Sequence, residues 1–133
     1  MVKSQTYRGE ADVKKEVKKL LTKHGWFWWC PPANGFGKAG TSDFHALRGG
    51  VFMAVETKFG SNRPTVLQRA FLQSIAAESA MAFVVDEVSV RDLRTWLAAF
   101  DCATAAVSKN EQVSAEDGAA MLDAVARLTE KML

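Results

Sequence analysis

The sequence contains very little cysteine and histidine. Its 133 residues include two cysteines, Cys30 and Cys102, and two histidines, His24 and His45. Two cysteines form neither a disulfide framework nor a zinc-ligand cluster, and two histidines argue against metal sites built on several histidines. We therefore expect a protein of a reducing compartment, whose chemistry depends on other residue types.

Long apolar runs and a strong excess of one charge are also missing. The N-terminal stretch "MVKSQTYRGEADVKK" has no apolar core of the kind found in signal peptides, and no segment reaches the length of a transmembrane helix. The net charge of +2 is too small to indicate a nucleic-acid partner, although a local basic surface can still exist. These absences predict a cytoplasmic protein without a membrane partner.

Apolar residues make up 48% of the chain and charged residues 24%, which is the balance of one globular domain. Hydrophobic periodicity predicts a helix over 10–23, a short aromatic strand over 26–30 and a hairpin of 43–47 with 51–59. It then predicts a helix from 64, a buried strand over 81–86, a helix over 89–100 and a final helix over 114–133. This order indicates an α/β fold with a small mixed sheet flanked by helices.

The apolar positions also predict how each helix faces the core. The positions expected to point inward are Val13, Val17, Leu20 and Leu21 in the first helix, Val66, Leu67, Phe71, Leu72 and Ile75 in the second, and Met121, Leu122, Val125, Leu128 and Met132 in the last. Ser89 and Asp92 are predicted to cap the helix over 89–100. Residues 1–100 would form the core, and residues 101–133 a helical extension of the same domain.

Charged residues near the hairpin suggest a chemical site. Strand side chains alternate between faces, so Glu56 and Lys58 lie side by side, and pairing across Gly49 and Gly50 brings Asp43 close to Glu56. Two carboxylates with an ammonium group at a strand end make a reasonable magnesium site, because hard cations prefer oxygen ligands. The lysine can orient a water molecule and offset charge that develops on a phosphate. A solvent-exposed strand edge is the plainer alternative.

Three short motifs in order carry a family resemblance. "GTSD" (40–43), "ETK" (56–58) and "PTVLQ" (64–68) resemble the PD-(D/E)XK nuclease superfamily, and most closely its virus-type replication-repair nuclease (VRR-NUC) group. The resemblance covers roughly residues 8–97. Ser42 stands where that group has proline, a change that affects turn rigidity and not the ligands.

The resemblance implies a restriction-endonuclease-like core and a role for each matching residue. Asp43, Glu56 and the carbonyl group of Thr57 would bind Mg²⁺, with Mn²⁺ as a substitute, and Lys58 would be the catalytic lysine. Gln68 would assist on the following helix, and Glu10 would be the glutamate of the first helix. The implied activity is DNA phosphodiester hydrolysis in phage or bacterial replication, recombination or repair, in a bacterial or phage-infected cell. The group includes dimeric enzymes that cut branched DNA such as four-way junctions.

Several of these residues have simpler alternative roles. Asp43 can start a turn, Gln68 matches a capping box with Thr65, and Glu10 suits the first turn of any helix, with Glu16 as a weaker substitute. His45 lies two residues beyond Asp43 and is expected to be structural. The final helix can form a dimer contact or pack on its own domain.

Candidate nucleic-acid contacts lie in two loops. "GFGKAG" (35–40) is not followed by a helix, which excludes a dinucleotide site, and it leaves Lys38 as a phosphate contact. Ser61, Asn62 and Arg63 precede the next helix, whose backbone N–H groups point outward. The lysines of the first helix are expected to be a solvated face. DNA is the expected partner, with RNA as a weaker possibility, and the alternative function is an inactive nucleic-acid-binding module.

Overall fold

The computed structural model describes residues 6–32 and 39–132, and its elements follow the predicted order. The elements are α1 (Glu10–Lys23), β1 (Phe27–Trp29), β2 (Phe44–Arg48), β3 (Val51–Thr57), α2 (Val66–Ala77), β4 (Met81–Val85), α3 (Val90–Ser108), α4 (Ala115–Leu128) and the 3₁₀ helix η1 (Glu130–Met132). The predicted α/β class with a small mixed sheet is confirmed. Within the described ranges no helix is both long and apolar enough to cross a membrane.

The four strands form one sheet in the order β1-β2-β3-β4. The first three strands are antiparallel, and β4 pairs parallel to β3 after the crossover through α2. Gly49 and Gly50 join β2 to β3 with φ values of 57° and 80°, a backbone region that favours glycine. The register opposes Phe44 to Val55, so the residue before β2 lies beside the end of β3.

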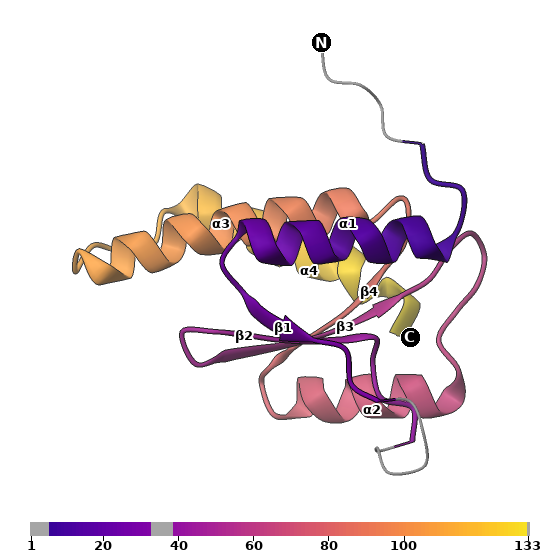
Figure 1. Ribbon diagram of the computed structural model, residues 1–133. Helices are drawn as coiled ribbons and strands as arrows, with labels where there is room; N and C mark the ends of the chain where they lie inside the picture. Colours follow the sequence, from indigo (N-terminus) through magenta and orange to yellow (C-terminus); the bar gives the residue numbers. More distant parts are fainter. Residues whose placement is uncertain (1–5, 33–38, 133) are drawn as a thin grey trace.

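Helices cover both faces of the sheet (Figure 1), and each face has its own apolar core. Alternation along β3 directs Met53 and Val55 toward α1 and α3, and directs Ala54 toward α2. The predicted inward residues of α1 are all buried. Met132 belongs to the core between the sheet and α2. The end of the chain therefore crosses from the face of the sheet that α1 and α3 cover to the face that α2 covers.

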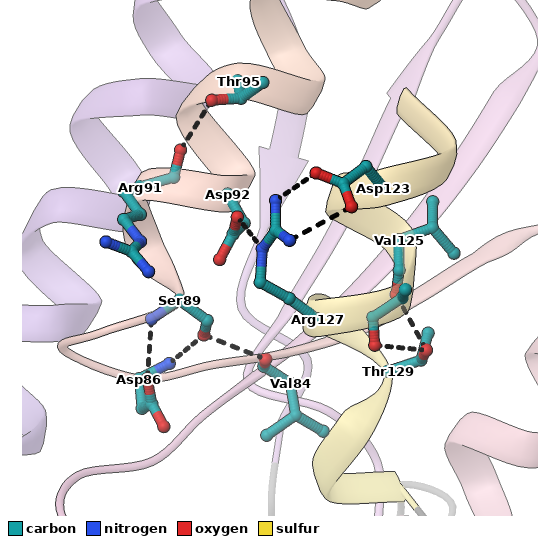
Figure 2. Close-up of polar contacts among 11 residues, drawn as sticks. Val84, Asp86, Ser89, Arg91, Asp92, Thr95, Asp123, Val125, Arg127 and Thr129 are labelled. Carbon is teal, nitrogen blue, oxygen red and sulfur yellow. Dashed lines mark hydrogen bonds and ion pairs between the residues drawn. The ribbon is translucent and has the colours of Figure 1, made fainter. Parts of the chain in front are cut away.

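Ion pairs fasten α4 to α3 (Figure 2). The Arg127 guanidinium donates to the buried Asp92 carboxylate at 2.6 Å and to Asp123 at 2.6 and 3.2 Å. One turn later, Lys131 pairs with Asp86 at 2.6 Å and donates to the carbonyl oxygens of Gly60 and Asn62. The C-terminal segment therefore contacts both α3 and the loop that follows β3.

The predicted cap of α3 is wrong. The Ser89 side chain makes no capping bond to the helix, and its Oγ instead accepts from the Asp86 N–H at 2.9 Å. The Asp86 carboxylate accepts from the N–H groups of Val88 and Ser89, as Figure 2 shows for Ser89. Asp92 is committed to Arg127, because a carboxylate that is 4% exposed needs a charged partner.

Two other predictions differ in detail. The α3 helix continues to Ser108, eight residues beyond the predicted end, because alanines fill this stretch and alanine has the highest helix propensity. Val66, Leu67 and Leu122 are 72%, 58% and 75% exposed instead of inward. In α2 the inward stripe is restricted to Phe71, Leu72 and Ile75, the residues packed beneath β3 and β4.

Candidate active site

The hairpin brings Asp43 to the end of β3, as the sequence predicts. Because Phe44 pairs with Val55, Asp43 lies one step beyond the ladder, beside Glu56. The Thr57 N–H and hydroxyl groups both donate to Asp43 Oδ2, at 2.9 and 2.6 Å. These two bonds fix the aspartate against the strand and leave its other oxygen for a further contact. Asp43 is therefore held by β3 itself.

Three carboxylates from three elements converge at this strand end. Glu10 is the first residue of α1, Asp43 precedes β2, and Glu56 is the penultimate residue of β3. Each offers an oxygen atom, and these three oxygens lie within 4.8 Å of one another. The structure thus brings together residues that are 46 positions apart in the chain.

Glu56 occupies an unfavourable position for a carboxylate. Its side chain is 2% exposed, and its Oε2 atom has no hydrogen-bond partner among the described residues. Lys58 Nζ lies 3.3 Å from its other oxygen. Burial, and then the negative charge of Asp43, raise the pKa of Glu56 to about 7, while Lys58 acts in the opposite direction. Lys58 therefore compensates the charge of Glu56 only in part, and Oε2 stays without a partner among the described residues.

The donor set fits a hard divalent cation. Mg²⁺ and Mn²⁺ prefer carboxylate oxygens, and the separations allow one ion to contact all three acids. An ion there would supply the partner that the buried Glu56 oxygen lacks. The fully buried Thr57 holds Asp43 through its N–H and hydroxyl groups. That the Thr57 carbonyl group is a metal ligand stays a prediction.

Gln68 is engaged in helix capping. Its side-chain oxygen accepts from the Thr65 N–H at 2.9 Å, while Thr65 Oγ1 accepts from the Gln68 N–H at 3.2 Å. This is the capping box that the sequence offered as the alternative to an active-site role. The catalytic role of Gln68 stays a prediction.

Three of the predicted nucleic-acid contacts follow Glu56 by five to seven residues and are exposed. Ser61, Asn62 and Arg63 form part of the loop between β3 and α2. The Asn62 carbonyl oxygen accepts from Lys131, and the Gly60 N–H donates to Glu87. Lys38 lies outside the described residues.

Two weaker candidates have structural roles. Glu16 is buried and pairs with Arg94 at 3.0 Å, which leaves Glu10 as the carboxylate of α1 in the cluster. His45 stacks on Phe71 at 5.7 Å and lies 3.3 Å from Thr41 Oγ1. Burial lowers the pKa of His45.

The sequence interpretation missed Lys14. Its ammonium group lies 3.6 Å from Asp43 Oδ1 and is the second cation beside the acids. Lys14 follows Glu10 by four residues, the helical spacing that places both on one face. That spacing was the available signal, but it was obscured by the other lysines of the helix.

No protein-family model matches the sequence, and no curated protein matches it either.

Proposed function

We propose that the protein is a divalent-metal-dependent nuclease that hydrolyses phosphodiester bonds in DNA. The observation that carries this proposal is the convergence of Glu10, Asp43 and Glu56 around a buried carboxylate oxygen without a partner, with Lys58 beside it. The proposal also draws on the resemblance of the "GTSD" and "ETK" segments to PD-(D/E)XK nucleases. Phosphoryl chemistry suits a site that combines several acids with a lysine.

Each side chain would have a distinct role. Glu10, Asp43 and Glu56 would hold Mg²⁺ or Mn²⁺, and Thr57 would keep Asp43 in place through its two hydrogen bonds. The bound cation would neutralise phosphate charge and lower the pKa of a water molecule. Lys58 is 14% exposed, so its ammonium can reach a substrate while it remains anchored near Glu56. It would orient the attacking water and offset negative charge on the phosphate.

A cleavage panel tests this proposal. Labelled linear, single-stranded, flapped and four-way-junction DNAs are incubated with Mg²⁺, with Mn²⁺ and with a chelator. We expect cleavage that requires the ion and falls at least ~100-fold in Glu56→Gln and Lys58→Gln. Glu111→Gln is the matched control, because Glu111 is exposed in the link between α3 and α4. RNA versions of the same substrates test the alternative polymer.

Two outcomes would contradict the proposal. Undiminished cleavage by Glu56→Gln would remove the metal assignment. DNA binding without cleavage under any ion would favour the alternative of an inactive binding module on the same scaffold.

A dimer, which the resemblance implies, is part of the same proposal. Symmetric cutting of two strands of a junction needs two sites related by a twofold axis. The predicted final helix ends at Leu128, and η1 follows it. Most of the predicted apolar stripe packs on its own domain, since Met121, Val125 and Leu128 of α4 contact the larger core and Met132 of η1 the smaller one. Light scattering over a concentration series tests the dimer, and a strict monomer would exclude paired cutting by the isolated protein.

A further inference from the structure

A pocket of about 290 Å³ opens beside the acidic cluster, on the side of α1. Its walls come from α1, from the chain just after β1 and from residues 41–44 at the start of β2. Asp43 belongs both to this pocket and to the carboxylate cluster, so the two sites share a wall. The size is near the lower limit of pockets that bind small ligands or parts of larger ones.

Two cations line this pocket. Lys14 and Lys18 are four residues apart, which places them on one face of α1. The side chain of Lys14 is 39% exposed and lies 3.6 Å from Asp43 Oδ1, a loose contact for an ion pair. Lys18 is exposed and forms no ion pair with any described residue. The pocket therefore holds more positive charge than Asp43 alone can compensate.

The shared aspartate couples the pocket to the metal site. Asp43 Oδ2 is already occupied by Thr57, and the negative charge of the carboxylate is what attracts Lys14. A cation bound by Glu10, Asp43 and Glu56 would draw on that same charge and weaken the hold on Lys14. Lys14 would then be available for an anion in the pocket. The adjacent Thr41 supplies a hydroxyl group that can donate to the same anion.

We propose that this pocket binds the phosphate group next to the cleaved bond in the DNA strand, with Lys14 and Lys18 as its cationic ligands. The inference rests on the proposed nuclease function. It adds the path of the bound DNA strand, which runs from the acidic cluster along α1. Because Lys14 pairs with Asp43 until the metal binds, metal and DNA should each raise the affinity for the other.

Binding measurements on lysine variants test the pocket. The probe is a fluorescein-labelled single-stranded DNA dodecamer, followed by anisotropy with Ca²⁺ present and again with a chelator. We expect Lys14→Gln and Lys18→Gln to weaken binding by about 5- to 10-fold each, and to reduce the slope of log K against log salt by about 0.7 each. The wild type should bind DNA more tightly in Ca²⁺ than in chelator, and this difference in affinity should be smaller in Lys14→Gln.

Lys15→Gln and Lys19→Gln are matched controls. They remove the same charge from the same helix, but their side chains line a different pocket with Asp12 and Glu16. Equal losses of affinity in both pairs would overturn the proposal, because a merely diffuse basic face would then explain the binding. Unchanged melting temperatures in all four variants establish that folding is not the cause.

Failure of the pocket and failure of the nuclease proposal are distinguishable. If the wild type cleaves DNA and the two pairs of variants bind alike, the pocket assignment is wrong and the nuclease stands. If neither the wild type nor any variant cleaves DNA, but Lys14→Gln and Lys18→Gln still weaken binding more than Lys15→Gln and Lys19→Gln, the pocket is a DNA phosphate-binding site and the nuclease proposal is wrong.

Discussion

At the scale of single residues, Glu56 has the most unusual environment in the described part of the chain. It is a buried acid with one oxygen lacking a partner, beside a second acid. Burial of a carboxylate that Lys58 compensates only in part opposes folding. The same arrangement favours metal binding, because an ion replaces the missing partner. Stability without metal and affinity for metal should therefore change in opposite directions at this position.

Glu56→Gln should stabilise the metal-free protein at pH 8. The native pKa of about 7 lies above the ordinary value of 4.5, so between these pH values the native state binds more protons than the unfolded state. The free energy of unfolding therefore falls as the pH rises through this window, by on the order of 1–3 kcal/mol. An uncharged amide at position 56 would remove this loss of stability at high pH. Thermal melts in chelator should show a higher melting temperature for the variant at pH 8 and convergence with the wild type near pH 5.

Added Mn²⁺ provides the second half of this test. It should raise the melting temperature of the wild type and leave that of Glu56→Gln unchanged. An equal rise in both proteins would place metal binding elsewhere.

Gln68 offers a contrasting case, because its contacts are those of a helix cap. We expect Gln68→Ala to lower the free energy of unfolding by about 0.5–1 kcal/mol in urea melts, since one half of the capping box with Thr65 is lost. Cleavage should change less than twofold. A large loss of cleavage without a loss of stability would instead restore its predicted catalytic role. Gln112→Ala, in the exposed link before α4, is the control.

At the scale of elements, α4 packs on the larger core through Ala124 and Leu128 and also contacts α3 through one buried charge. Asp92 is 4% exposed, and the only ion pair that the described residues give it is with Arg127. Removal of one partner from a buried pair leaves the other charge uncompensated, which costs more than an exposed pair is worth. The link between Arg127 and Asp123 is of the exposed kind, as Asp123 is 65% exposed.

Arg127→Met should therefore lower the free energy of unfolding measurably in urea melts, because it leaves the buried Asp92 carboxylate without its ion-pair partner. Asp123→Asn, the control, should lower the free energy of unfolding clearly less, because it breaks only an exposed ion pair within α4. The double variant Asp92→Asn, Arg127→Met should recover part of the loss in a double-mutant cycle. Additive effects of the two single changes would contradict the role assigned to this pair.

The sequence predicted elements well where one physical signal dominated. Periodicity located α1 and its buried face, and the paired glycines 49 and 50 located the hairpin, which in turn placed Asp43 next to Glu56. The cap of α3 was mispredicted because the Ser89 hydroxyl bonds back to the N–H of Asp86, three residues before it, and Asp92 pairs with Arg127 of α4. The partner of Asp92 lies 35 residues further along the chain and is not visible in a local pattern.

Three of the predicted inward positions, Val66, Leu67 and Leu122, were wrong because burial also depends on long-range packing. Leu67 and Leu122 have helical spacing to their neighbours, but how much of a helix rests on the sheet depends on the packing of whole layers. The pairing of Lys14 with Asp43 also required the three-dimensional arrangement, because five lysines share the first helix.

At the scale of the whole molecule, the chain after α3 contributes to both cores. Ala124 and Leu128 of α4 are fully buried in the larger core, and Met132 lies in the core on the α2 side. The description of residues 101–133 as an extension of the same domain implies that they fold together with the rest. The structure therefore links the C-terminal segment to stability of the complete sheet.

A chain that ends at residue 110 should lose cooperative folding. The loss of α4 and η1 exposes apolar surface of α3 and of both sheet faces, and it removes the Lys131 contacts to Asp86 and the loop after β3. Circular dichroism melts should show a broad transition, and the protein should aggregate. Retention of a sharp transition by the shortened chain would contradict this and mark the C-terminal segment as dispensable.

One glycine constrains how this protein can vary. Gly40 has φ +75°, and a Cβ atom placed there would lie 2.4 Å from the main-chain carbonyl atoms of Leu67 and 2.8 Å from the Gln68 nitrogen. No side chain can rotate away to make room, because the obstacle is backbone. A saturation library at position 40 should consequently return only the parental residue among well-folded clones, whereas the neighbouring exposed Ala39 should accept most replacements.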